Sequence, residues 1–174
     1  MRYFFAIEPN AQAKLNIDHW RNQYLPAFDH PVPVGNFHIT TAFLGEVEQD
    51  KLEVICEHID KQHLPAPFSL TLDQQGYWSK PKVYWLGCQN VPKGLLDLVK
   101  LTEKAGKIAK INLPKRPYIA HLTLARKCAF EPASALLAPE FTTPITELGL
   151  YESISGKSGV KYLKRFSWTL PNKR

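Results

Sequence analysis

The chain has 174 residues, 44% of them hydrophobic, with 4 Trp, 7 Tyr and 9 Phe, and its formal net charge is +6. This size and composition suit one domain with a sizeable core, residues 1–174, and exclude a disordered chain. No run approaches the roughly 18 apolar residues of a membrane helix, and the positive charge favours a polyanionic partner.

Strands and helices are expected to alternate in the first half. Residues 2–7 have the composition of a strand, and a helix with one apolar face follows, formed by Ala13, Ile17, Trp20 and Tyr24. A strand around residue 38 comes next. Asp50 and Glu53 have the spacing of a capping box, which predicts a helix from about residue 50 with an apolar stripe of Leu52, Ile55, Cys56 and Ile59.

The second half repeats this order. After a strand at 68–72, we expect a strand at 83–88, a helix from about 93 to 110 with Leu95, Leu98, Val99 and Leu101 near its buried side, and a strand around residue 121. Strands at 145–152 and 162–170 close the chain. Basic residues gather around residue 121 and again towards the end, the latter being Lys157, Lys161, Lys164, Arg165, Lys173 and Arg174.

Two segments of the predicted strands carry the same pattern, a histidine and a threonine separated by one apolar residue. The pairs are His38 with Thr40 and His121 with Thr123. Because side chains alternate between the two faces of a strand, both members of a pair point the same way. With 6 His and 9 Thr in the chain, the pattern is expected about 0.3 times by chance. Two copies therefore indicate function rather than two buried, hydrogen-bonded histidines.

The residues between and beyond each pair point to the opposite face of their strand. We expect Ile39, Thr41 and Phe43 to turn towards a core, and Leu122 and Leu124 to do the same in the second strand.

The residue types of the two pairs suit acid–base chemistry on a phosphate. Histidine, with an ordinary pKa near 6.5, can accept or donate a proton at neutral pH. Threonine hydroxyls can donate hydrogen bonds to phosphate oxygens that gain charge in the transition state. His38 and His121 are therefore the predicted catalytic residues, and Thr40 and Thr123 the predicted phosphate ligands.

The sequence resembles the 2H phosphoesterases, which are named for two His-x-Thr/Ser motifs, and within them the RNA 2′,3′-cyclic phosphodiesterases, first described as 2′-5′ RNA ligases. The segments that carry the resemblance are 2–7, 36–40, 42–47, 116–118, 121–126, 150–153 and 162–170. Thr41 departs from the usual leucine, and Ala120 stands where a proline commonly precedes the second histidine.

The resemblance implies a fold and a reaction. The fold is α+β and bilobal with a pseudo-two-fold axis: two mostly antiparallel sheets flank a central cleft, with helices outside. The reaction is hydrolysis of 2′,3′-cyclic phosphate RNA ends to 2′-phosphates, with a weak reverse 2′-5′ ligation. The two motifs are too similar for the sequence to assign the acid and base roles, and the resemblance favours His38 as acid and His121 as base. The partner is RNA with such an end or a 2′-5′ linkage. The alternative is a non-catalytic RNA- or nucleotide-binding module that uses the same cleft.

Three further residues are candidates for contact with RNA. Arg126 matches a family position that contacts phosphate, and a guanidinium suits that task. Strict alternation would place it opposite His121, so the strand must twist, bulge or end first. Arg116 and Tyr118 are candidate contacts with the RNA strand or a stacked base.

The remaining histidines and the cysteines set further expectations. His19, His30, His58 and His63 are expected at the solvated surface, and no metal or other cofactor is expected because neither motif has an accompanying carboxylate or cysteine at ligand spacing. Cys56, Cys88 and Cys128 form no C-x-x-C pair, and the first residues do not resemble a signal peptide. We expect a cytoplasmic monomer.

Overall fold

The computed structural model describes residues 1–172, so Lys173 and Arg174 of the basic C-terminal group lie outside the described part. The elements in chain order are β1 (Arg2–Ile7), α1 (Ala11–Tyr24), the 3-10 turn η1 (Val34–Asn36), β2 (Ile39–Glu46), α2 (Gln49–Asp60), β3 (Phe68–Leu72), β4 (Gln74–Trp78), β5 (Val83–Gly87), α3 (Lys93–Ile108), β6 (His121–Ala125), β7 (Phe141–Ile145), β8 (Glu147–Gly156) and β9 (Gly159–Thr169).

The strands form two antiparallel sheets. Seven of them make one sheet in the order β4-β5-β6-β2-β1-β8-β9, and β3 pairs with β7 in a second sheet. The predicted repeat is present, because β1-α1-β2 and β5-α3-β6 share the order strand, helix, His-x-Thr strand. The α+β class with antiparallel sheets and outer helices is confirmed.

The two halves of the large sheet meet at its centre. There β2 and β6 run antiparallel and Ile39 pairs with Leu122, whereas β1 pairs with β2 along the whole length of β1. The motif strands β2 and β6 are thus neighbours in one sheet. This register places His38 and His121 on either side of the same short contact.

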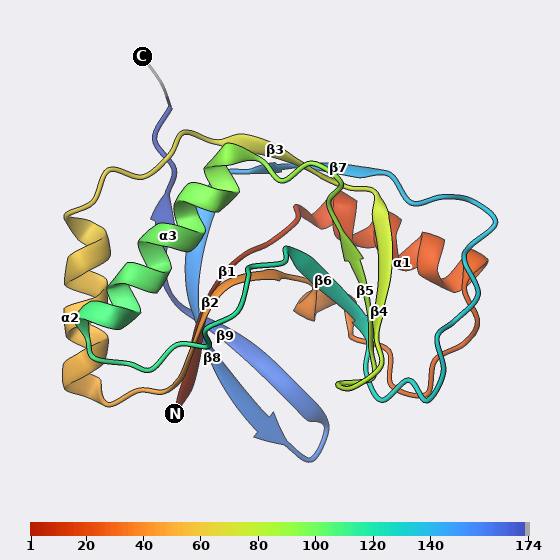
Figure 1. Ribbon diagram of the computed structural model, residues 1–174, viewed down its shortest axis with the longest axis horizontal. Helices are drawn as coiled ribbons and strands as arrows, with labels where there is room; N and C mark the ends of the chain where they lie inside the picture. Colours follow the sequence, from red (N-terminus) through yellow and green to blue (C-terminus); the bar gives the residue numbers. More distant parts are fainter. Residues whose placement is uncertain (173–174) are drawn as a thin grey trace.

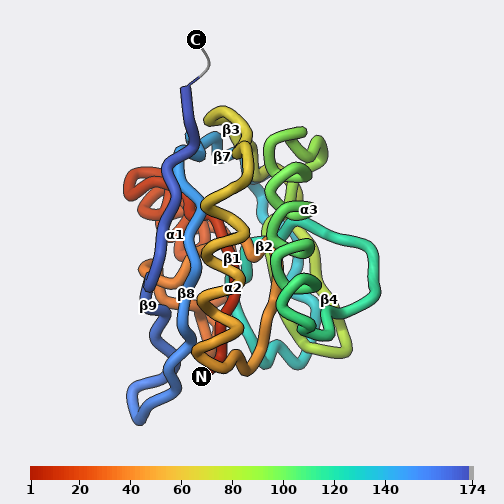
Figure 2. Tube along the Cα trace, turned by 90° about the vertical axis from the view of Figure 1, so that its left-hand side faces the viewer, coloured from red at the N-terminus to blue at the C-terminus, as the bar shows by residue number. Residues whose placement is uncertain are grey.

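The helices cover one face of the sheet and build the core there. Ile17 of α1, Ile55 of α2 and Leu98 of α3 belong to the same buried cluster as Ile39 and Leu122. Figure 1 shows α2 and α3 side by side towards one end of the molecule and α1 towards the other. The β8–β9 hairpin projects beyond the remaining strands, as Figure 2 shows from the side. The opposite face of the central strands β2 and β6, which the helices do not cover, carries the two His-x-Thr pairs.

Three expectations about the elements need correction. Helix α2 begins at Gln49, with Glu48 at its N-cap and no side-chain cap, so the capping box is wrong; Asp50 lies in the first turn, where the helix dipole favours its charge. The strand expected at 145–152 is divided, because β7 ends at Ile145 and β8 begins at Glu147. The sequence analysis also missed β4, whose polar composition hides an edge strand.

Phe43 is the fourth correction. It was expected in the core, but its side chain is 53% exposed, while Ala42 and Leu44 on either side are buried. The pairing of β1 with β2 shifts register between Phe5 and Ala6, which stand opposite Ala42 and Thr40. This bulge leaves Thr41 and Ala42 both buried and returns Phe43 to the face of Thr40.

Candidate active site

The four motif side chains lie together on the face of the sheet away from the helices. Thr41 of β2 bonds to Thr102 of α3, which fixes the helix side of that strand. His38 and Thr40 alternate with it and point the other way. Extending the antiparallel register of Ile39 and Leu122 by one residue each way sets His38 across from Thr123, and Thr40 across from His121.

Both imidazole rings are held by the same interaction, a hydrogen bond from Nδ1 to a main-chain carbonyl two residues earlier. Nδ1 of His38 lies 2.7 Å from the carbonyl oxygen of Asn36, and Nδ1 of His121 lies 2.8 Å from that of Ile119. A carbonyl only accepts, so Nδ1 carries the proton and donates in each case. The neutral ring then has a free lone pair on Nε2. In His38 this nitrogen lies 3.1 Å from the Thr40 hydroxyl, which can donate to it.

The surroundings of both rings favour the neutral form of the imidazole in the free protein. Burial lowers the pKa of His38 to about 4, with smaller lowering from the charges of Arg126 and His121 and opposing effects of the Asn36 carbonyl and Glu8. Burial also lowers the pKa of His121, helped by the positive charges of Arg126 and Arg116. Both Nε2 atoms are therefore proton acceptors until a negative charge arrives.

Arg126 lies near both histidines, since its charge lowers the pKa of each. The pairing of β5 with β6 shifts register between Tyr84 and Trp85, which stand opposite Ala125 and Thr123. Leu124 and Ala125 are consequently both buried, and Arg126 is exposed just after the strand. This bulge resolves the alternation problem and returns Arg126 to the face of His121 and Thr123.

Aromatic rings flank each histidine, and the sequence analysis did not identify them. The His38 ring lies 4.9 Å from Phe4 and 5.0 Å from Tyr162, and the His121 ring lies 4.7 Å from Trp78. These rings come from β1, β9 and β4, two of which are edge strands. Their contact with the motifs depends on sheet order, for which the local sequence carries no signal.

A pocket of about 110 Å³ opens beside His38. Its lining combines aromatic, amide and charged groups, namely Phe4, Glu8, Gly35, Asn36, His38, Tyr151, Tyr162 and Lys164. Glu8 binds Lys14 at 2.6 Å and accepts from the Tyr151 hydroxyl at 2.5 Å, and these bonds, with the charges of Lys14 and Lys164, hold the pKa of Glu8 below its usual range despite burial. The pocket therefore contains a fixed carboxylate that its neighbours neutralise.

Arg116 and Tyr118 occupy different surroundings. Arg116 is exposed, and its charge reaches His121. Tyr118 is partly buried, and its hydroxyl donates to the Thr40 carbonyl at 2.8 Å. The Tyr118 hydroxyl thus supports the backbone of the first motif, and only its ring is left for contact with RNA.

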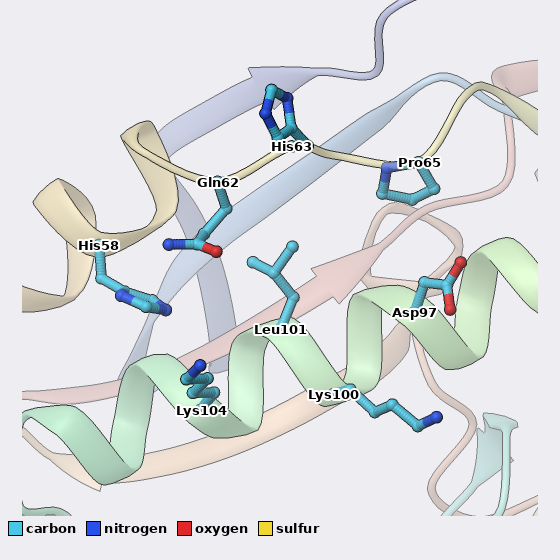
Figure 3. A pocket seen from close by; sticks show the side chains of 8 residues that line it. All are labelled: His58, Gln62, His63, Pro65, Asp97, Lys100, Leu101 and Lys104. Atoms are coloured by element: carbon cyan, nitrogen blue, oxygen red, sulfur yellow. The ribbon is translucent and has the colours of Figure 1, made fainter.

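A second pocket lies away from the motifs, between the end of α2 and one side of α3. It measures about 310 Å³ and is lined by His58, Gln62, His63, Pro65, Asp97, Lys100, Leu101 and Lys104 (Figure 3). The expected solvated position is wrong for His58, which is partly buried and whose Nε2 has no hydrogen-bond partner among residues 1–172. His19, His30 and His63 are exposed, as predicted.

Within residues 1–172, no group of three or more His, Cys, Asp and Glu side chains is arranged to hold a metal ion. Over the same part of the chain, the three helices are all too short or too polar to cross a membrane.

Comparison with known proteins gives one consistent family. A sequence model of LigT-like phosphoesterases matches residues 7–85. The RNA 2′,3′-cyclic phosphodiesterase of Escherichia coli is 33% identical over 172 residues, 97% of this chain and 96% of that protein. The chain belongs to the LigT-like phosphoesterase family. A relative of the same name from Methanocaldococcus jannaschii is 30% identical and covers 72% of this chain and 71% of its own length.

Solved LigT-like phosphoesterases share the fold as well. The crystal structure of E. coli LigT complexed with 3′-AMP superimposes with a TM-score of 0.89, at 32% identity and 97% coverage of both chains. The two departures noted in the sequence have local explanations in this LigT-like chain. Thr41 is buried against Thr102, and Ala120 is buried in the main hydrophobic cluster.

Proposed function

We propose that this chain hydrolyses the 2′,3′-cyclic phosphate at RNA 3′ ends to a 2′-phosphate, using His38 and His121 without a metal. The observation that carries the proposal is the matched pair of imidazoles, each fixed through Nδ1 by a carbonyl two residues earlier. Relatives named RNA 2′,3′-cyclic phosphodiesterase support the choice of substrate. The net charge of +6 favours a polyanion.

The proton transfers use the free Nε2 of each ring, in the roles that the family resemblance implies. Water attacks phosphorus while the 3′ oxygen of the ribose leaves on the far side. His121 Nε2 takes the proton from water, and His38 Nε2, once protonated, gives one to the leaving oxygen. The negative phosphate supplies the charge that raises the pKa of the acid above its low value in the free protein. Nδ1 stays protonated throughout, so each ring keeps its orientation.

The non-bridging oxygens need donors on the same face. Thr40 lies across from His121, and Thr123 lies across from His38. Both hydroxyls can donate hydrogen bonds to the non-bridging phosphate oxygens. Arg126 adds a guanidinium, which can bind two phosphate oxygens at once. The same site, with a ribose hydroxyl in place of water, would join ends through a 2′-5′ bond as a weak reverse reaction.

The experiment uses purified protein in EDTA with an oligonucleotide that ends in a 2′,3′-cyclic phosphate, and separates 2′- from 3′-phosphate products. We expect a 2′-phosphate, and a loss in kcat of about 10²–10⁴-fold in His38→Ala and in His121→Ala. His19→Ala, which alters an exposed histidine, is the matched control.

Other outcomes have definite meanings. Tight binding without turnover would replace hydrolysis by the binding-module alternative. Inactivity in EDTA that added metal restores would overturn the metal-free mechanism. Full activity of either alanine variant would remove that histidine from the reaction.

We also propose that the protein acts in the cytoplasm as a monomer. Cys56, Cys88 and Cys128 are all unpaired, which suits a reducing compartment. Both motifs come from one chain, so a second copy is not needed to complete the site. Light scattering measures the mass in solution, and the mass of a dimer would contradict the proposal of a monomer.

A further inference from the structure

The pocket beside His38 lies on the side of that ring away from His121. Strands β1, β8 and β9 follow β2 in the sheet on the side opposite β6, and they supply the aromatic walls of the pocket, Phe4, Tyr151 and Tyr162. Its volume of about 110 Å³ equals that of roughly three or four water molecules, which is room for one phosphate group. A part of the substrate that continues past His38 on this side reaches the pocket.

Lys164 is the cation of this pocket, and Glu8 is its carboxylate. The ammonium of Lys164 lies 2.6 Å from Glu147 Oε1 but 3.6 Å from Glu8 Oε2, and its side chain is 41% exposed. An ammonium has three N–H donors, so one short bond leaves donors for a further partner. Glu8 is occupied by Lys14 and by the Tyr151 hydroxyl. Lys164 is therefore the group in the pocket that can bind an anion.

The proposed reaction sets the direction of the RNA chain in the site. His38 gives its proton to the 3′ oxygen of the terminal ribose, so this oxygen faces His38, and the attacking water lies on the His121 side. In ribose, C3′ is bonded to C4′, which carries C5′ and the link to the preceding nucleotide. C2′ is bonded to C1′, which carries the base. The preceding phosphate therefore lies on the His38 side of the ribose, where the pocket is.

We propose that the pocket beside His38 is a subsite for the phosphate on the 5′ side of the terminal nucleotide, and that Lys164 binds this phosphate. The inference rests on the proposed function, with His38 as the acid. It makes the preferred substrate an RNA chain or a 5′-phosphorylated nucleotide rather than a nucleoside cyclic phosphate. A bridge between Glu8 and Glu147 is the purely structural role of Lys164, and it would not distinguish substrates with and without this phosphate.

Two substrates test the proposal on the intact chain, adenosine 2′,3′-cyclic phosphate and the same compound with a 5′-phosphate. We expect the wild type to have a kcat/KM about fivefold higher for the 5′-phosphorylated substrate, which is the gain of one exposed ion pair. The carboxylates of Glu8 and Glu147 lie close to Lys164 and prevent a larger gain. Lys164→Met should abolish the preference, and Lys164→Arg, which restores the charge, should keep it.

Lys161→Met is the matched control. Lys161 is exposed on the same strand, and alternation places it on the face opposite Tyr162 and the pocket. The substitution removes the same charge from the β8–β9 hairpin, so the preference for the 5′-phosphate should stay as in the wild type. Rising salt should reduce the wild-type preference, because the contact is exposed to solvent.

Calorimetry separates the subsite from the reaction, because it needs no turnover. Adenosine 2′,5′-bisphosphate should bind about fivefold more tightly than adenosine 2′-monophosphate in the wild type and in Lys161→Met, and equally tightly in Lys164→Met. A Lys164-dependent preference in a protein that hydrolyses neither substrate would refute only the hydrolysis. The subsite itself would be refuted by a wild type without the preference, by a preference that survives in Lys164→Met, or by an equal loss in Lys161→Met.

Discussion

The two histidines have their chemistry set by main-chain atoms rather than by other side chains. The carbonyls of Asn36 and Ile119 fix the protonated nitrogen of each ring. Burial then lowers both pKa values, and the charge of Arg126 lowers them further. A substrate phosphate reverses this effect, because its negative charge stabilises an imidazolium. Protonation of His38, the proposed general acid, is in this way coupled to substrate binding.

The pH dependence of the reaction should reflect these lowered values. The kcat/KM profile reports the free protein, which must have one ring protonated and the other neutral. With the pKa of His38 near 4 and that of His121 below 6.5, we expect a bell whose maximum lies between about pH 4 and 6.5. In Arg126→Ala, loss of the positive charge should move the profile to higher pH. A maximum above pH 7 in the wild type would contradict this.

The low pKa of His38 should also appear in stability. The unfolded chain binds a proton near pH 6.5 and the folded chain only near 4, so His38 reduces stability as pH falls through this window and leaves it unaffected above. Between pH 7.5 and 4.5 the wild type should therefore lose about 2 kcal/mol more unfolding free energy than His38→Gln.

Urea unfolding at the two pH values measures this difference. His19→Gln, at an exposed position of α1, should follow the wild type. Equal losses in the wild type and in His38→Gln would show that His38 titrates normally in the folded protein.

At the scale of elements, helix α3 determines which face of β2 is buried. The hydroxyl of Thr102 lies 3.0 Å from that of Thr41 and 2.9 Å from the Leu98 carbonyl, and both threonines are buried. Buried hydroxyls need partners, so this pair fits in only one register of the strand against the helix. The polar residue that departs from the family pattern at position 41 is thereby accommodated.

A double-mutant cycle tests this contact. Thr41→Val and Thr102→Val should each destabilise the protein by about 1 kcal/mol, since each leaves a buried hydroxyl with one partner fewer. The double variant should cost less than the sum of the two, because no hydroxyl remains unpaired. Chemical denaturation supplies the four free energies. Strict additivity would mean that the two hydroxyls do not interact.

At the scale of the whole molecule, the site spans the narrowest connection in the large sheet. The halves meet where Ile39 pairs with Leu122, while the outer strands pair over most of their lengths. The proposed phosphate position lies directly over this connection. Binding of a phosphate at the site should therefore also stabilise the contact between the two halves of the large sheet.

Hydrogen exchange can detect this effect. Inorganic phosphate at about 100 times its Kd should stabilise the fold by about 2.7 kcal/mol. The amides of Ile39 and Leu122 should gain additional protection against local opening, whereas those near Ser155, at the tip of the β8–β9 hairpin, should change least. Protection that rises uniformly along the chain would indicate global stabilisation only.

Much of the fold could be predicted, because the strands and helices follow local periodicity and the two His-x-Thr segments mark equivalent strands. Phe43 and Arg126 could not be placed by alternation, since a bulge depends on the register of a neighbouring strand. The aromatic rings of Phe4, Trp78 and Tyr162 were missed for a related reason. They come from strands distant in sequence, whose order in the sheet no local pattern records.

The bulges also determine where this chain can change in length during evolution. The segment from 127 to 140 lies between strands, and added residues there need not move either histidine. One residue gained or lost between His121 and Arg126 would instead turn the guanidinium towards the core. A change of one residue between His38 and Phe43 would likewise turn the Phe43 ring towards the core. Divergent relatives should therefore vary freely in loop length while keeping the five-residue intervals from His38 to Phe43 and from His121 to Arg126. That interval is a constraint on geometry rather than on residue identity.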